Sequence, residues 1–274
     1  MNIRASMLPG YVDCSRRSAA KQYRKHFEKD GYEFRQLPPS VGAAAGTAVH
    51  KGVEVALKAR WARKQVTADD ILQPAYELFM GETAPGAIWD DTTPNANVAQ
   101  QQIRSMISAY LQGPGKNVVP LTMPNGEPAV ELHLEANAGD GWMVTGTMDI
   151  ATDGWVRDLK TGALMRPYQA QLGAYGLLAL SNKVIVDIKG LCIDFVQRKG
   201  KTKAQPPCVT QEYPVDVSMK YARGIIQRIQ ADMACYDATG DLNAAFMANP
   251  CSMMHSEKYC PAFGTDFCKM GTLK

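Results

Sequence analysis

Two carboxylates and a lysine stand close together near the middle of the chain. Asp158 follows Asp149 by nine residues, and Lys160 comes two residues after Asp158. The Asp-Gly pair at 153–154 favours a tight hairpin turn, which would set Asp149 and Asp158 side by side on adjacent strands. Lys160 shares a strand face with Asp158, because side chains two positions apart point the same way. Two carboxylates can hold Mg²⁺ or Mn²⁺, and a nearby ammonium can orient a water molecule and stabilise developing negative charge. This combination suits phosphodiester cleavage, and its alternative is an ordinary ion pair at a strand end.

Four further side chains could join this group. His50 lies on a predicted helix, with Glu54 one turn later on the same face, and an imidazole is a ready metal ligand. The alternative for His50 is a hydrogen-bonded core histidine. Glu131 begins a predicted strand and could add a third carboxylate, or it could face solvent. Gln171 and Tyr175 are four residues apart on a predicted helix. Both could hydrogen-bond a phosphate or a base, whereas the alternative for Tyr175 is core packing.

The elements that would position these residues follow from the spacing of the apolar side chains. Helices are predicted at 15–29, 43–64, 68–80, 97–111, 168–180 and 217–236. Strands are predicted at 129–136, 142–151, 155–160, 184–197 and 208–213. This mixed order predicts an α/β fold with a mixed central sheet flanked by helices. We expect one domain over residues 1–274, with a helical part at 1–112, a core at about 128–237 and an irregular, Cys-rich tail at 249–274.

The composition allows a substantial core and a partner that is a polyanion. The chain has 274 residues, is 46% hydrophobic and carries a net charge of +3. Two basic runs suit a phosphate backbone, although each could also be a solvated surface. The first comprises Arg16, Arg17, Lys21, Arg24 and Lys25, and the second Arg198, Lys199, Lys201 and Lys203. No apolar run reaches the ~18 residues that a membrane span needs, and the N-terminus lacks a signal-peptide pattern. We therefore expect a cytoplasmic protein with no membrane partner.

Taken together and in this order, the candidate residues resemble the PD-(D/E)XK nuclease superfamily, in particular its RecB-like branch with the AddB-like exonucleases of bacteria and phages. The resemblance spans about residues 43–181. It rests on a Gly-x-x-x-His helix, an early acidic residue, Gly-x-x-Asp, Asp-x-Lys and Gln-x-x-x-Tyr. These motifs match Gly46 with His50, then Glu131, Gly146 with Asp149, Asp158 with Lys160, and Gln171 with Tyr175.

The resemblance implies a restriction-endonuclease-like core and a division of roles among these residues. His50, Asp149, Asp158 and the Leu159 carbonyl would bind Mg²⁺ or Mn²⁺. Lys160 would assist the attacking water, Glu131 would join the catalytic carboxylates, and Gln171 and Tyr175 would shape the DNA side of the site. The implied activity is a metal-dependent deoxyribonuclease, an exonuclease of recombination or repair. Alternatives are a catalytically silent DNA-binding module and a nuclease that trims DNA ends in CRISPR adaptation. The chain has no Walker motif, so any ATP-driven unwinding would need a helicase or recombination partner.

The cysteines suggest a second cofactor site. There are seven of them, and three lie in the last 24 residues. An odd number in a chain without an export signal argues against a disulfide framework. AddB-like nucleases hold an iron–sulfur cluster of the 4Fe-4S type with one Cys before the core and three after it, which resembles Cys14, Cys251, Cys260 and Cys268. The spacing departs from the family pattern, and His255 could replace Cys251. Zinc and buried free thiols are the alternatives. A shared cofactor would require the two ends of the chain to meet.

Overall fold

The computed structural model describes residues 1–200 and 203–271. A six-stranded mixed sheet flanked by helices forms the centre, which confirms the predicted fold class. The strands are β1 (Asn2–Arg4), β2 (Val130–Gly139), β3 (Trp142–Thr152), β4 (Trp155–Gly162), β5 (Gly190–Gln197) and β6 (Val209–Tyr213). The α-helices are α1 (Leu8–Asp13), α2 (Ser15–Gln22), α3 (Arg24–Lys29), α4 (Val41–Trp61), α5 (Ala68–Thr83), α6 (Ala96–Gln112), α7 (Gln169–Ser181), α8 (Val215–Thr239) and α9 (Leu242–Ala245).

Strand β3 has three partner strands, and two of them share one edge of β3, on either side of a gap that contains Asp149. Strand β2 runs antiparallel along one edge of β3, from the Gly139–Trp142 pair to the Val130–Ile150 pair. On the other edge, β1 pairs parallel with residues 143–145 and β4 pairs antiparallel with residues 150–152. Between these two pairings, residues 146–149 have no strand beside them on that edge in the described part of the chain. We call this stretch of β3, between its pairings with β1 and with β4, the fork of the sheet. Asp149 lies in it.

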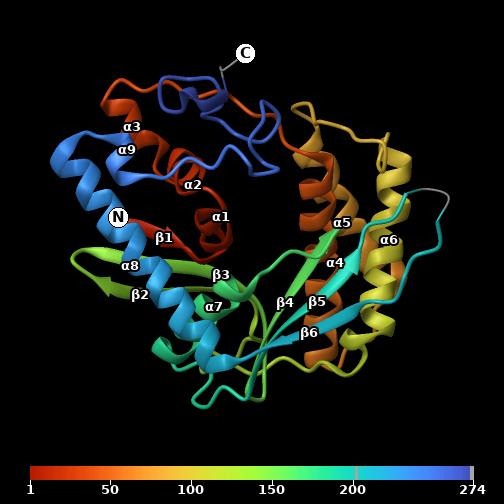
Figure 1. The fold of residues 1–274 in the computed structure, drawn as a ribbon. Helices are drawn as coiled ribbons and strands as arrows, with labels where there is room; N and C mark the ends of the chain where they lie inside the picture. Colours follow the sequence, from red (N-terminus) through yellow and green to blue (C-terminus); the bar gives the residue numbers. More distant parts are fainter. Residues whose placement is uncertain (201–202, 272–274) are drawn as a thin grey trace.

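The two faces of the sheet carry separate apolar cores. Helices α4, α5 and α6 lie on one side of the sheet, and α7 and α8 lie on the other (Figure 1). On β5, Val196 packs with the α4–α6 core and Ile193 packs with the α7–α8 core. Such opposite orientations follow from the two-residue repeat of a strand. The sheet is thus buried on both faces, which fits the unbroken burial of residues 190–196 on β5.

Two glycines of the candidate motifs allow helices to approach the sheet closely. A Cβ atom at Gly46 of α4 would lie 2.8 Å from the Thr161 hydroxyl oxygen of β4. A Cβ atom at Gly146 of β3 would lie 2.8 Å from the ring of Tyr175 on α7. Any larger residue would push the helix away, because these distances are below normal van der Waals contact. The glycines thus bring α4 and α7 onto the strands that carry Asp149 and Asp158.

The N-terminal helices and the C-terminal tail pack together (Figure 1). The Arg16 guanidinium donates to the carbonyl oxygens of Leu242 (2.7 Å) and Phe246 (3.0 Å). The ring centroids of Phe27 and Phe267 lie 4.7 Å apart. The two ends of the described chain therefore meet, as a shared cofactor would require. No helix in the described ranges has both the length and the apolar character needed to cross a membrane.

Two local predictions need correction, and two short elements were missed. The helix expected at 15–29 is interrupted at Tyr23, where the backbone leaves the helical conformation between α2 and α3. The strand expected at 184–197 begins only at Gly190, and residues 184–189 form a connection after α7. Strand β1 and helix α1 were not predicted, because such short segments lack a measurable repeat.

Candidate active site

Three potential metal ligands converge at the fork in the sheet. One ligand atom from each of His50, Glu131 and Asp149 lies within 4.8 Å of the other two. His50 Nδ1 is 3.2 Å from Glu131 Oε1 and 3.4 Å from Asp149 Oδ2. Asp149 is buried, and the other two side chains are partly buried. We call these three residues the ligand group.

Each member of the ligand group comes from a different element. His50 lies on α4, one turn after Gly46, which faces Thr161 of β4. Glu131 lies at the start of β2, in a left-handed conformation with φ of +52°. This conformation costs a non-glycine residue about 1–3 kcal/mol, and such strain gathers at functional sites. The pairing of β2 with β3 passes from Val130 directly to Leu132 at this point. The backbone of β2 is therefore distorted where Glu131 joins the group.

A buried ion pair lies next to the ligand group. Lys160 Nζ is 2.6 Å from Asp158 Oδ2, and the side chain of Asp158 is fully buried. The backbone N–H of Leu159, between these two residues, donates to Asp149 Oδ2 at 2.7 Å. Asp149 therefore joins the ligand group to strand β4. Asp158 and Lys160 were expected to point to the same face of their strand, and the ion pair agrees with this. The pair is buried, not exposed to solvent.

The charges at this site control one another. Burial favours neutral His50, but the charge of Asp149 and the hydrogen bonds to Asp149 and Glu131 outweigh it and raise the pKa of His50 to about 10. Burial also opposes ionisation of Asp149, yet the charges of His50 and Lys160 hold its pKa below the usual range. Burial and the charge of Asp149 raise the pKa of Asp158, against the opposing charge of Lys160. The positive charges of His50 and Lys160 therefore offset the carboxylates of this site.

The donor atoms fit a hard divalent cation. The ligand group offers one imidazole nitrogen and carboxylate oxygens, a set that suits Mg²⁺ or Mn²⁺. The buried oxygens of Asp158 make no hydrogen bond to any described residue and rely on the Lys160 ion pair alone. They are available to a further positive partner. Glu54 is instead engaged by Lys51 and Lys58, at 3.0 and 2.7 Å.

Gln171 and Tyr175 lie under the site rather than on its open side. The Gln171 amide donates to the Tyr175 hydroxyl at 2.8 Å, and both residues are buried. Burial raises the pKa of Tyr175, and the charges of Asp158 and Asp149 add to this shift. The charges of Asp149 and Asp158 therefore act on the Tyr175 hydroxyl. The Tyr175 ring also packs against Gly146, so packing and proximity to the site occur together.

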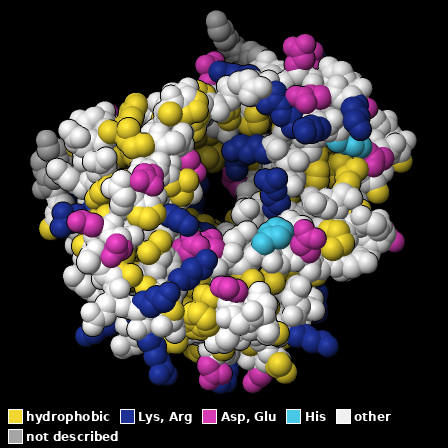
Figure 2. Space-filling model, turned by 180° about the vertical axis from the view of Figure 1, so that it is seen from behind, with side chains coloured by type: hydrophobic (Ala, Val, Ile, Leu, Met, Phe, Trp, Pro, Cys, Tyr) yellow, Lys and Arg dark blue, Asp and Glu magenta, His cyan; other side chains and the backbone are white. Residues whose placement is uncertain are grey.

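The arginines of the two basic runs serve the fold. Arg16 and Arg17 are buried, and Arg17 bonds to Ser252 (3.0 Å) and Asp13 (2.8 Å). Arg198 pairs with Asp90 at 2.9 Å. These three residues were expected at a phosphate backbone, and that expectation is wrong for them because carbonyls and carboxylates occupy their guanidinium groups. Lys201 lies outside the described residues. Figure 2 shows a hollow in one face of the molecule, with Lys and Arg side chains around its rim.

The four cysteines suggested as cofactor ligands differ in exposure. Cys14, Cys260 and Cys268 are buried, whereas Cys251 is exposed. Burial raises the pKa of Cys260, and the charges of Cys268 and Cys14 raise it further. Among the described residues, however, the three sulfur atoms do not all lie within 4.8 Å of one another, as the ligand group does. His255 Nε2 is buried and has no hydrogen-bond partner among the described residues. The packing of the chain ends thus gathers Cys14, Cys260 and Cys268 in one region.

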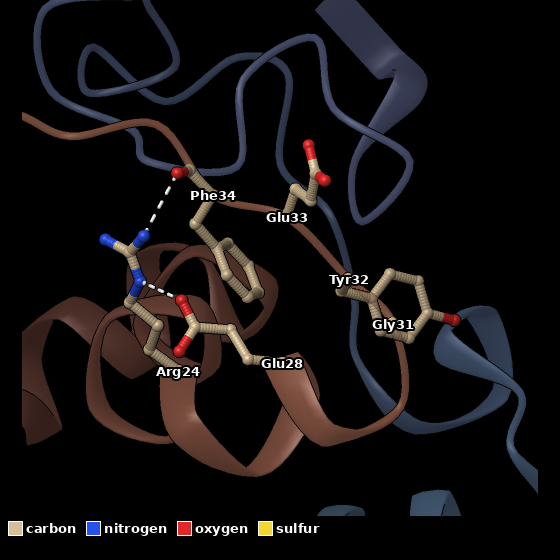
Figure 3. Close-up of a pocket in the computed structure, with 6 residues that line it drawn as sticks. All are labelled: Arg24, Glu28, Gly31, Tyr32, Glu33 and Phe34. Carbon is tan, nitrogen blue, oxygen red and sulfur yellow. Dashed lines mark hydrogen bonds and ion pairs between the residues drawn. The ribbon is translucent and has the colours of Figure 1, made fainter.

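A separate surface pocket of about 410 Å³ lies beside α3. Figure 3 shows its lining, in which Arg24 bonds to the carboxylate of Glu28 and to the carbonyl oxygen of Phe34. The guanidinium of Arg24 is therefore engaged by neighbouring residues of the lining. None of the ligand group lines this pocket, and we assign it no function.

Comparisons with known proteins add little to this description. No protein-family model and no curated protein matches the sequence. The chain is similar to a solved structure from Eubacterium rectale, of a protein provisionally named an exonuclease. The two chains are 12% identical with a TM-score of 0.42, over 73% of this chain and 71% of that one. A likeness at this level carries no argument about function, which must come from the site itself.

Proposed function

We propose that this protein is a metal-dependent deoxyribonuclease that hydrolyses phosphodiester bonds. One observation carries the proposal: a group of His50, Glu131 and Asp149 lies beside the buried Asp158–Lys160 pair at the fork of the sheet. A cation site next to an immobilised ammonium is the combination that phosphodiester hydrolysis requires. The motif order in the sequence supports assignment to the RecB-like branch.

The cation would be held by His50, Glu131 and Asp149, with Asp158 as a neighbouring carboxylate. When bound, Mg²⁺ or Mn²⁺ would supply Lewis-acid polarisation of a phosphoryl oxygen and would lower the pKa of a water molecule. The fit rests on the clustered donors and on the Asp158 oxygens that lack hydrogen bonds. The expected ligands were His50, Asp149, Asp158 and the Leu159 carbonyl. The proposed ligand group also includes Glu131, for which the sequence had left open a place among the carboxylates or a position facing solvent.

The protein groups act by holding charge and position. Asp158 fixes the Lys160 ammonium, which orients the attacking water and stabilises negative charge on the phosphate as it develops. The Leu159 N–H fixes one carboxylate oxygen of Asp149. Gln171 and Tyr175, both buried, support the site from α7. Pre-ordered groups of this kind cost no reorganisation when the reaction occurs.

The experiment compares linear and circular DNA as substrates for the purified protein. End-labelled linear DNA, single- and double-stranded, and closed circles are incubated with Mg²⁺, with Mn²⁺ and with a chelator. We expect metal-dependent loss of linear DNA, with circles surviving if the protein is an exonuclease. Asp149→Asn should abolish the reaction, whereas Asp187→Asn, at an exposed position, should not. DNA retention without cleavage under every metal condition would refute the nuclease proposal and favour the silent DNA-binding module.

We also propose that Cys14, Cys260 and Cys268 bind an iron–sulfur cluster or zinc. Their burial in one region supports a shared cofactor, and Cys251 or His255 is the candidate fourth ligand. Elemental analysis and visible absorption of protein purified without oxygen test this. Iron with visible absorption indicates the cluster, zinc without colour indicates the alternative, and neither metal at stoichiometric level contradicts both.

The partner of the proposed activity is DNA, and a helicase or recombination protein would supply unwinding if the substrate is duplex. Recombination or repair is the setting that the motif resemblance suggests, and trimming of DNA ends in CRISPR adaptation is its alternative. Co-purification with a helicase would support the former.

A further inference from the structure

Tyr168 lies against Lys160 at the start of helix α7. The Lys160 ammonium is 5.3 Å from the centroid of the Tyr168 ring. A cation within about 6 Å of an aromatic centroid is attracted to the ring face. Tyr168 belongs to none of the motifs discussed above, and nothing in the sequence pattern distinguished it from a residue at the edge of the core.

The Lys160 ammonium is confined by groups of different kinds. Asp158 binds it at 2.6 Å, and the charge of Asp149 acts on it as well. The side chain of Lys160 is 18% exposed, so a small part of it reaches solvent. A long lysine side chain can rotate about several bonds, and a single ion pair leaves much of this freedom. The aromatic face adds a second contact on the same ammonium.

We infer that Tyr168 is a positioning residue that fixes the Lys160 ammonium for the proposed nuclease reaction. This inference rests on the proposed function and extends it to a residue outside the family motifs. Tyr168 acts through the lysine and is not itself assigned to the reacting atoms. The ring is the active part, because the Tyr168 hydroxyl has no hydrogen bond to any residue in the described ranges.

The backbone around Tyr168 is suited to hold the ring still. Its carbonyl oxygen accepts the first hydrogen bond of α7, from the Leu172 N–H at 3.0 Å. Pro167 precedes it and fixes the approach of the chain. The connection from β4 is fastened at its start, where the Arg198 N–H donates to the Gly162 carbonyl at 2.8 Å. Lys160 on β4 is therefore contacted by the Tyr168 ring, which is fixed to the start of α7.

The first test is a kinetic comparison of Tyr168→Leu with Tyr168→Phe, on end-labelled linear DNA with Mn²⁺. Tyr168→Leu removes the aromatic face and should lower kcat by about threefold to thirtyfold, with little change in KM. Tyr168→Phe keeps the face and should rescue kcat to within about twofold of wild type. Tyr221→Leu, on an exposed tyrosine of α8, is the matched control and should leave kcat unchanged.

The second test reads the position of the lysine without any reaction. Protons above an aromatic face resonate upfield because of the ring current. In protein with ¹³C-labelled lysine, the Lys160 side-chain methylene signal, assigned by its loss in Lys160→Arg, should be shifted upfield in wild type and in Tyr168→Phe. It should return to the ordinary position in Tyr168→Leu. If that variant does not fold, the wild-type and Tyr168→Phe spectra still decide the matter.

The outcomes separate this inference from the proposed function. If wild-type protein cleaves DNA and Tyr168→Leu cleaves equally well, the inference is wrong and the nuclease proposal stands. An equal loss in Tyr168→Phe and Tyr168→Leu would assign the effect to the hydroxyl and would also overturn it. An unshifted Lys160 signal in wild type overturns the positioning contact. Absence of cleavage in wild type, with the upfield signal present, would refute the nuclease proposal while retaining the contact.

Discussion

Replacing Gly173 by alanine should destabilise the protein, because α7 and α8 touch at this glycine. An added Cβ atom would lie 2.0 Å from the carbonyl oxygen of Ser218 on α8. Carbon and oxygen atoms do not approach closer than about 3.3 Å without strain, so the helices would have to separate by roughly 1.3 Å. The neighbour is backbone, which cannot rotate away. Overpacking of a well-packed core costs about 1–3 kcal/mol, and we place this case at about 3.

The net effect is the difference between this clash and a favourable helix term. Alanine in a helix interior is about 1 kcal/mol better than glycine, which leaves a net loss of about 2 kcal/mol. For a chain of this size, each kcal/mol shifts the melting temperature by roughly 2–4 °C, so we expect a decrease of about 4–8 °C. Gly224 on α8 is the matched control, because it is exposed and an added Cβ would meet nothing within 4 Å.

The assay is thermal unfolding followed by circular dichroism, with urea titration as a second measurement. Gly224→Ala should raise the melting temperature by about 2–4 °C, since only the helix term remains. Gly173→Ala should lower it and should also reduce cleavage, because α7 carries Tyr175 and Gln171 beneath the site. A Gly173→Ala protein that melts at or above the wild-type temperature would refute the close-contact argument.

Three further predictions concern the charges and the chain ends. Lys160→Ala should abolish cleavage while DNA retention in a gel-shift assay largely survives, and cleavage at a near wild-type rate would contradict its role. The metal-free protein should lose stability as pH rises towards about 10. Folding raises the pKa of His50 from 6.5 to about 10, so the stability that protonated His50 contributes is complete below pH 6.5 and is lost as pH rises to about 10. Melting temperatures measured in chelator should therefore fall between pH 6.5 and about 10 in wild type, and should fall less in His50→Asn. Parallel curves for the two proteins would show that His50 is not the group responsible. Cys14→Ser should lower the melting temperature and increase proteolysis of residues 249–271 if the thiols share a cofactor, whereas an unchanged digestion pattern would argue for free thiols.

Local patterns were sufficient for the parts of the site that lie on regular elements. The helical repeat predicted the helix of His50, and the Asp-Gly turn predicted the hairpin that brings Asp149 and Asp158 to adjacent strands. The two-residue strand repeat predicted that Lys160 would share a face with Asp158, and the structure has them as an ion pair. These features depend on residues within one or two elements, and such short-range order is encoded in composition and spacing.

Features that depend on distant segments could not be predicted in the same way. Glu131 reaches the ligand group through a left-handed backbone, which no side-chain repeat reports. The buried Arg16 appeared as part of a basic surface, because its carbonyl partners lie 226 residues away. The contact between Tyr168 and Lys160 depends on how α7 settles on β4. Long-range packing of this kind overrides the local signal and must be observed in three dimensions.

The meeting of the chain ends has a consequence for the order of folding during synthesis. The helices that carry Arg16 and Phe27 leave the ribosome long before their partners Leu242 and Phe267, which are translated more than two hundred residues later. Until then the Phe27 side chain lacks its final cover, and an exposed apolar surface on an incomplete chain favours aggregation or chaperone binding. Strand β1 likewise cannot pair until β3 emerges. Residues that are translated late, such as Leu242 and Phe267, therefore complete the burial of helices that were made much earlier.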